Sequence, residues 1–430
     1  HQIVDSLDLS IPSGPTESRT YGPECDYTKI PYDYTRTHMP TNRDTRPGTP
    51  SGTAEPTPPD YQLNIIGGFT DAFHFHPIIV RDSTATIYLH NNMLDYNHSY
   101  YVTIDEGVLT LPDHSFHGIS KEHNWSFKTK DSAPASTDTL IVDANGQGDF
   151  NTVQGALDFI PDFSQKQTVI LIQAGDYEEL VYARNKTNVK IKGAGMDRTR
   201  VHYANNEVFN PHPLTVKTNE WPGTFPSRRA AFMLDNCSDI LLEDLTIATD
   251  LHGQAEGLLL NGERIALYSV HIIGSGDALQ ANGTIYMESC ELDGGGDTIL
   301  GRGSLFAYRS NFRNDGGPFS WVRNTTGNHG DVFVECTFAA PDGKKADAEF
   351  VVINCKVKNI IPQGWSAIGE KSSRMYEFNT CDMETGKPVD VSQRHAYSRQ
   401  LDAQKDAALI ADYMNPAFVL KGWQPFSYLK

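Results

Sequence analysis

The second half of the chain repeats one short pattern of apolar residues, and this repeat limits the possible folds more than any other feature. Units of the form apolar-x-apolar-x-x-small-x-apolar recur about 19 to 26 residues apart. Their apolar residues alternate as in a β-strand, with period 2 and not the period 3.6 of a helix. One unit cannot bury its apolar face alone, so we expect successive units to stack as the coils of an all-β solenoid. The units start near Ile240, Ile265, Ile285, Leu305, Phe333, Phe350 and Tyr376.

Most of the six cysteines fall at the small position of this repeat. Cys290, Cys336, Cys355 and Cys381 take that position in their units. We expect them, together with Cys237, to be buried in one internal ladder rather than paired as disulfides. No CxxC pair is present, which argues against a zinc site. The cysteine pattern thus predicts no zinc site.

The net charge excludes one class of partner. The chain of 430 residues carries a formal charge of −18 at pH 7, whereas nucleic acid requires a basic surface. The same charge would repel a fully ionised polyanion and tolerate a nearly neutral polymer. No apolar run approaches the roughly 18 residues of a membrane helix. We therefore expect no nucleic-acid partner and no membrane span.

Two segments of different composition precede the repeats. Residues 1–60 are rich in Pro and Thr and lack a sustained period, which predicts an extended segment. Residues 61–131 contain short alternating stretches between Asn, Asp and Gly turns, which predict a small β-sandwich. Their Tyr-Tyr-Val-Thr-Ile and Trp-Ser-Phe-Lys-Thr stretches resemble bacterial immunoglobulin-like modules. The resemblance implies a spacer or docking module.

Two aspartates occupy equivalent positions of successive units. Asp277 and Asp297 each follow the first residue of their unit, Ile265 or Ile285, by 12 residues. Neighbouring strands lie about 4.8 Å apart, so the two carboxylates would stack at roughly that distance. Because both cannot ionise cheaply there, one pKa rises, and the pair offers a carboxylate and a carboxylic acid near neutral pH. Such a pair suits nucleophilic attack with proton donation. The alternative is two ordinary turn aspartates after glycine.

Several segments, in the same order along the chain, resemble motifs of the pectinesterases. The clearest are Gln254-Ala-Glu-Gly-Leu258, Gly274-Ser-Gly-Asp-Ala-Leu279 and Asp297-Thr-Ile-Leu-Gly301, similar to Gln-Ala-x-Ala-Leu, Gly-Tyr-Gln-Asp-Thr-Leu and Asp-Phe-Ile-Phe-Gly of the family. Two further matches lie earlier in the chain. Residues 140–157 resemble the strand, glycine turn and capping helix at the start of the family. A Gly-x-Tyr-x-Glu motif contains Tyr177 and Glu179, and we expect these two residues to position the first coils. The resemblance implies that residues 139–430 form a right-handed parallel β-helix. We expect a terminal helix over 402–412 to cap its coils.

The resemblance also implies an activity and residue roles. The family hydrolyses galacturonate methyl esters of pectin without metal or cofactor. Asp297 would attack the ester carbonyl as nucleophile, and Asp277 would protonate methanol and then activate the water that releases the acyl-enzyme. Gln254 would donate a hydrogen bond to the oxyanion. We expect a secreted, monomeric enzyme acting on pectin or a related methylated uronate polymer.

The chain departs from the family pattern at three places. The second oxyanion glutamine of the family falls at Gly276, where a backbone N–H or a water would have to serve. The aromatic residue after the nucleophile is Thr298. The Leu-Gly-Arg-Pro-Trp motif has no counterpart, and Ala340-Pro-Asp-Gly-Lys344 takes its place.

A replacement for the missing arginine is therefore needed near the nucleophile. Arg323 follows Trp321 by two residues on the next coil, so both share one strand face, and Trp321 could serve as a platform for the sugar. Arg302, five residues after Asp297, is the rival candidate, and a site with neither arginine is the third alternative.

Two other functions remain open from the sequence. One is a non-catalytic pectin-binding β-helix, since several active-site elements have changed. The other is a polysaccharide lyase or glycosidase on a similar β-helix. A lyase would be expected to show an acidic calcium cluster with a basic group, and the sequence places no obvious Lys or Arg base beside the aspartate pair.

Overall fold

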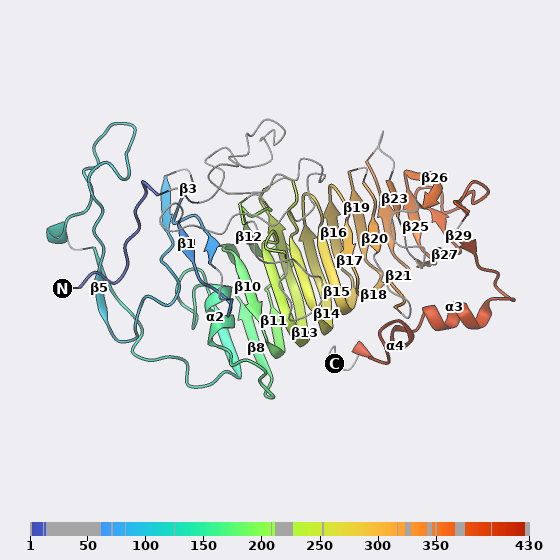
Figure 1. The fold of residues 1–430 in the computed structure, drawn as a ribbon, viewed down its shortest axis with the longest axis horizontal. Helices are drawn as coiled ribbons and strands as arrows, with labels where there is room; N and C mark the ends of the chain where they lie inside the picture. Colours follow the sequence, from blue (N-terminus) through green and yellow to red (C-terminus); the bar gives the residue numbers. More distant parts are fainter. Residues whose placement is uncertain are drawn as a thin grey trace.

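The protein is described by a computed structural model that covers most of the chain. The described residues are 2–11, 13, 62–69, 72–81, 83–123, 125–207, 209–210, 227–251, 253–315, 317–322, 328–341, 346–348, 351–365, 375–396 and 398–425. One elongated stack of parallel strands dominates the molecule (Figure 1). This stack confirms the predicted parallel β-helix.

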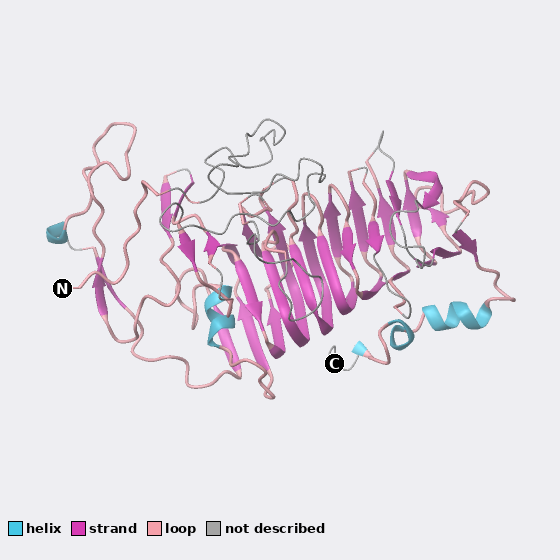
Figure 2. Cartoon of the chain, viewed as in Figure 1, coloured by secondary structure: helices cyan, strands magenta, loops and turns pink. Residues whose placement is uncertain are grey.

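The strands of the stack pair in parallel from one coil to the next (Figure 2). The first coils contain β7 (Thr139–Val142), β8 (Thr168–Ile172), β9 (Gly175–Glu178), β10 (Val181–Arg184), β11 (Thr187–Lys192) and β12 (Thr199–Tyr203). The middle coils contain β13 (Phe232–Thr249), β14 (Leu258–Ile273), β15 (Leu279–Glu288), β16 (Glu291–Gly294), β17 (Ile299–Gly301), β18 (Ser304–Tyr308), β19 (Asn311–Asn314), β20 (Ser320–Val322), β21 (Asp331–Val334) and β22 (Thr337–Ala339). The last coils contain β24 (Val351–Ile353), β25 (Lys356–Lys358), β27 (Met375–Phe378), β28 (Cys381–Asp382) and β29 (Ser398–Gln400), beside a separate parallel pair, β23 (Ala346–Ala348) and β26 (Ile360–Trp365).

The predicted repeat sets the register of these strands. Ile240 pairs with Ile265, and Ile265 pairs in turn with Ile285. All three are buried in one apolar core inside the coils. Each fully buried side chain of this size contributes about 1.5–3 kcal/mol relative to exposure. The alternation in the sequence therefore corresponds to side chains that point alternately into and out of the coil.

The cysteine ladder is present, with one change. Cys290, Cys336 and Cys355 are buried free thiols, and Cys381 is a half-buried one. Backbone N–H groups of neighbouring coils donate to the carbonyls of Cys290, Cys336 and Cys355, as the stacking requires. Cys237 is also buried and free, but it pairs with Gly262 in another strand segment and is not a member of this ladder.

A short helix closes the N-terminal end of the core, as the resemblance implied. Helix α2 (Val153–Phe159) begins at Thr152, whose hydroxyl accepts from the N–H of Gly155, and it buries Val153 and Leu157. The carboxylate of Glu179 accepts from the N–H groups of Val153 and Gln154 at 2.7 and 2.9 Å. Glu179 thus anchors the helix to the first coils, which is the positioning role predicted for it.

The immunoglobulin-like sandwich expected over 61–131 is not confirmed. The described residues of this segment form three separate antiparallel ribbons: β1 (Leu63–Asn64) with β2 (Phe73–His74), β3 (Ile78–Arg81) with β4 (Thr84–Ile87), and β5 (Ser99–Tyr101) with β6 (Ser126–Lys128). A 3-10 turn, η2, spans Lys121–His123. Phe69 and Phe73 pack on Tyr182 of the first coils. The early part of the segment is therefore joined to the β-helix through a shared apolar cluster.

The C-terminal helices correct another expectation. Helix α3 (Ala407–Tyr413) begins later than the predicted 402, and α4 (Pro416–Val419) follows it. Tyr413 and Val419 belong to one apolar cluster with Tyr286 and Phe306, which lie in coil strands. The two helices thus pack along the side of the coils, where Figure 1 shows them, and do not cap the end of the stack.

Candidate active site

A ladder of three acidic residues lies at the ends of the turns that lead into successive strands. Leu258, Leu279 and Ile299 are partners in register on β14, β15 and β17. The residues two positions before them are Glu256, Asp277 and Asp297. The predicted equivalence of Asp277 and Asp297 is therefore confirmed, and the structure adds Glu256 one coil earlier.

Glycines allow the turns that carry these acids to stack closely. A Cβ at Gly296 would lie 2.3 Å from the carbonyl oxygen of Gly276, and one at Gly276 would lie 2.5 Å from that of Gly253. The N–H of Gly296 donates to the carbonyl of Gly276. The loss of the second family glutamine thus has a physical reason, since position 276 has no space for a side chain.

The two aspartates differ in burial. Asp277 is 3 % exposed, whereas Asp297 is half-buried. The more accessible carboxylate is the one that the sequence assigned to attack the substrate, and the buried one is the one assigned to proton transfer. A nucleophile must reach the substrate, so the difference in burial fits the roles assigned to the two acids.

A buried arginine that the sequence analysis did not single out connects the acidic ladder. Arg229, 2 % exposed, lies just before β13. It donates from Nε to Glu256 Oε1 at 2.6 Å, from Nη2 to Asp277 Oδ2 at 3.0 Å and from Nη1 to Gln254 Oε1 at 3.0 Å. Nη1 also lies 3.6 Å from Glu207 Oε2. One guanidinium therefore contacts both a predicted catalytic acid and the predicted oxyanion donor.

The charges in this cluster change the ionisation of its members. Burial opposes the charged form of Arg229, but the carboxylates of Glu256, Asp277 and Glu207 outweigh it and raise the pKa of the guanidinium. Burial raises the pKa of Glu256 to about 7; Arg229 opposes this shift and Asp277 adds to it. Arg229 is thus a fixed positive charge, and Glu256 is a carboxyl that holds a proton close to neutral pH.

The contact with Arg229 also orients the side-chain amide of Gln254. A guanidinium only donates hydrogen bonds, so it must face the amide oxygen and not the amide nitrogen. The NH₂ end of Gln254 therefore points away from Arg229 and can serve other acceptors. This is the orientation that an oxyanion donor requires.

The remaining predicted residues have different outcomes. Thr298 is fully buried and accepts from Asn314 Nδ2 at 2.9 Å, and a part for it in substrate binding stays a prediction. Arg302 follows β17, at the opposite end of that strand from Asp297. The backbone of Trp321 pairs with Leu300. Arg323 lies outside the described residues, so its contact with Asp297 stays a prediction.

A signal for Glu256 was present in the repeat. The stretches Glu256-Gly-Leu, Asp277-Ala-Leu and Asp297-Thr-Ile share the order acid, small or polar residue, aliphatic. Extending the alignment one unit back would have found the first of them. Arg229 had no such signal, because it lies one residue before the equivalent repeat position and reaches its partners only through a long side chain.

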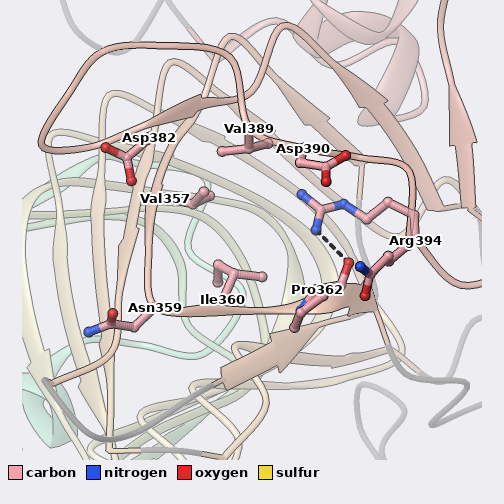
Figure 3. A pocket seen from close by; sticks show the side chains of 9 residues that line it. Val357, Asn359, Ile360, Pro362, Asp382, Val389, Asp390 and Arg394 are labelled. Carbon is pink, nitrogen blue, oxygen red and sulfur yellow. Dashed lines mark hydrogen bonds between the residues drawn. The ribbon is translucent and has the colours of Figure 1, made fainter.

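Two hollows lie along the described part of the coils. One, of about 470 Å³, is lined in part by Ser275 and Gly295, from the turns before the aspartates, and by Arg313 and Lys358. The other, of about 270 Å³, lies near the C-terminal coils, where Arg394 donates to the carbonyl of Pro362 (Figure 3). The described lining of the first hollow takes in the turns that precede Asp277 and Asp297 but neither aspartate itself.

One group among the described residues has a geometry suited to a cation. Glu178, His202 and Asp250 bring possible ligand atoms within 4.8 Å of one another. Both carboxylates already pair with arginines, Glu178 with Arg81 and Asp250 with Arg200. Nδ1 of His202 donates to the Asp250 carboxylate at 2.5 Å. The group is thus largely neutralised, and it lies outside the acidic ladder.

The chain is similar in sequence to a family model and to known proteins. A family model described as Pectinesterase matches residues 139–315. Probable pectinesterase 8 of Arabidopsis thaliana is 25% identical over 312 residues, covering 65% of this chain and 76% of that protein. Putative pectinesterase 14 of the same plant is 30% identical over 255 residues, covering 57% of this chain and 68% of that protein. This chain belongs to the pectinesterase family. Its members are carboxylic-ester hydrolases, and so is this chain.

Solved pectin methylesterases share the fold of this pectinesterase-family chain. The enzyme from carrot has a TM-score of 0.51 at 20% identity and covers 68% of this chain and 95% of its own. Pectin methylesterase PemA from Erwinia chrysanthemi has a TM-score of 0.52 at 16% identity and covers 68% and 99%. Within the described residues, no helix has the length and apolar character needed to cross a membrane.

Proposed function

We propose that this chain removes methyl esters from galacturonate residues of pectin, with Asp297 as nucleophile and Asp277 as general acid and base. The observation that carries the proposal is the placement of the two carboxylates at equivalent positions of successive coils. Gln254, with its amide oriented by Arg229, lies on the coil before Asp277 and supplies an oxyanion donor. Membership in the pectinesterase family supports the choice of substrate.

The reaction has two steps. An oxygen of Asp297 attacks the ester carbonyl carbon, Gln254 donates to the oxyanion, and Asp277 transfers its proton to the departing methoxy group, which leaves as methanol. Asp277, now ionised, takes a proton from a water molecule that attacks the acyl-enzyme. This step releases the galacturonate carboxyl group and restores the free Asp297 carboxylate and a protonated Asp277.

The charge of the chain bears on the form of the substrate. A net charge of −18 disfavours approach to fully de-esterified, ionised pectin. Highly esterified pectin is nearly neutral and is therefore the preferred substrate in this proposal. Action outside the cell on plant cell-wall material, by a monomer, is part of the same proposal.

The test is to supply highly methyl-esterified pectin and measure three products. Esterase activity predicts methanol release with no new chain ends. Unsaturated ends absorbing in the ultraviolet would show a lyase, and new reducing ends without methanol would show a glycosidase. Binding to pectin with no product of any kind would favour a non-catalytic β-helix and contradict the proposal.

A further inference from the structure

Arg229 fixes the relative positions of three side chains at the proposed site. Its donors reach Glu256, Asp277 and Gln254 at distances between 2.6 and 3.0 Å. A guanidinium is planar and its donors have fixed directions, so the three acceptors are held as one unit. Each of these acceptors lies on a strand-entry turn, and Glu256 and Asp277 occupy equivalent positions of adjacent coils. Movement of one acceptor is therefore coupled to the others.

Three carboxylates share the Arg229 guanidinium. Glu256, Asp277 and Glu207 all lie within ion-pair distance of it, so three like charges would crowd around it if all of them ionised. Among the described residues, Tyr182 also interacts with Glu256 through its buried hydroxyl, and Arg228 interacts with the same tyrosine. Like charges crowded in a buried site favour retention of a proton.

The free oxygen of Glu256 indicates where that proton can be held. Glu256 is fully buried, and its Oε2 has no hydrogen-bond partner among the described residues, whereas Oε1 receives the Arg229 Nε–H. An ionised oxygen without a donor is costly in a buried site. Burial accordingly raises the pKa of Glu256 to about 7.

We propose that Arg229 and Glu256 are positioning residues for Asp277 and Gln254, and that Glu256 and Asp277 share one proton across the Arg229 guanidinium. The proposal rests on the proposed esterase function. In the reactive form Asp277 carries the proton and Glu256 is the anion that balances Arg229. In the resting alternative the proton is on Glu256, and Asp277 is the anion.

The shared proton has a consequence for the pH dependence. With Glu256 present, its negative charge offsets Arg229 and allows Asp277 to hold a proton up to near-neutral pH. Glu256→Gln keeps an acceptor for Arg229 Nε but removes that negative charge. Arg229 then acts on Asp277 alone and favours its ionised form, which cannot protonate methanol.

The experiment compares kcat for methanol release from highly esterified pectin between pH 4 and 9. We expect the basic limb of the Glu256→Gln profile to lie at least about 1 pH unit below that of the wild type. The matched control is Glu377→Gln, which alters a buried carboxylate paired with Arg394 at 3.0 and 3.1 Å near the C-terminal coils. The control should lower the melting temperature without moving the limb. If folded Glu256→Gln keeps the basic limb of the wild type, the proposal that Glu256 and Asp277 share a proton is overturned.

A second variant covers the case in which Glu256→Gln fails to fold. Arg229→Lys keeps the positive charge but loses the planar fork, so it cannot hold three acceptors in place. We expect kcat to fall about tenfold or more, with KM for pectin little changed. Wild-type kcat in Arg229→Lys would contradict the positioning role.

Failure of the esterase proposal itself is distinguishable. If the wild type releases no methanol, the proposed function has failed. Thermal denaturation then tests whether Glu256 holds a proton in the folded protein. A carboxyl with a raised folded-state pKa stabilises the fold at low pH and loses that contribution as pH rises through the folded pKa. The melting temperature of Glu256→Gln minus that of the wild type should then increase between pH 5 and 8. A difference that is constant with pH overturns the proposal.

Discussion

At the residue scale, buried acids away from the aspartate pair also determine how the protein responds to pH. Asp331 on β21 is buried, with 6 % of its surface exposed, and its carboxyl group accepts a hydrogen bond from the Ser320 hydroxyl at 2.6 Å. Burial raises the pKa of Asp331 to about 7, against the opposing effect of the Ser320 hydrogen bond. Burial outweighs the hydrogen bond, so Asp331 is a carboxyl that desolvation keeps protonated close to neutral pH.

Asp331→Asn is therefore expected to stabilise the protein at high pH relative to the wild type. The folded-state pKa is above the unfolded one, so the wild type loses stability as pH rises from about 4 to about 7, by an amount on the order of a few kcal/mol. Asn accepts the same Ser320 hydrogen bond and does not ionise. Melting temperatures measured at pH 4, 6 and 8 check this prediction, and equal pH slopes for the two proteins would refute it.

At the element scale, the anchoring of α2 shows how a family motif becomes a structural contact. Glu179 is buried and accepts two N–H groups from the first turn of the helix, while its neighbour Glu178, with a side chain 13 % exposed, pairs with the mostly exposed Arg81. Burial raises the pKa of Glu179 to about 7, although the two N–H donors lower it. The two adjacent glutamates thus provide a matched comparison.

Glu179→Ala should destabilise the protein by about 2 kcal/mol, because two buried N–H groups lose their acceptor. Glu178→Ala should cost less than about 1 kcal/mol, since its Arg81 partner is mostly exposed and no helix N–H group loses an acceptor. Denaturant unfolding of both variants measures the difference. Equal effects of the two substitutions would show that Glu179 does not anchor the helix.

The cysteine ladder makes a separate prediction for the coil strands. Burial raises the pKa of the Cys290 thiol to about 12 and that of the Cys237 thiol to about 12, so neither reacts readily in the folded protein. Denatured, unreduced protein should titrate with thiol reagent, and reductant should leave the melting temperature unchanged. A thiol count of zero would show that the ladder cysteines form disulfides.

The sequence predicts which residues form strands better than it predicts what those strands and the helices pack against, for a physical reason. Alternation at period 2 records which side chains face the core, and it therefore specified the pairing of Ile240, Ile265 and Ile285. The stretches within 61–131 alternate too, but alternation does not specify a partner strand, and the residues formed separate ribbons. The helix expected at 402 begins at Ala407 and packs sideways, because its apolar face matches the outer cluster containing Tyr286.

At the scale of the whole molecule, the site depends on several coils at once. Repeat spacing was sufficient to pair Asp277 with Asp297, since each coil places equivalent residues one strand apart. Arg229 could not be found in this way, because its guanidinium spans from its own turn to the two coils that follow. The sequence therefore predicts the carboxylates of the site but not the cation that holds Asp277.

The activity of the aspartate pair is the central claim, and one measurement tests it most directly. Initial rates of methanol release from highly esterified pectin are compared for the wild type, Asp297→Asn and Asp277→Asn, with melting temperatures recorded for each. We expect both variants to lose at least about 99 % of kcat, the scale for removing a nucleophile or a general acid. We expect the melting temperature of Asp297→Asn to stay near that of the wild type, because Asp297 is the more accessible of the two acids. A folded Asp297→Asn protein that retained more than about a tenth of wild-type kcat would contradict the account.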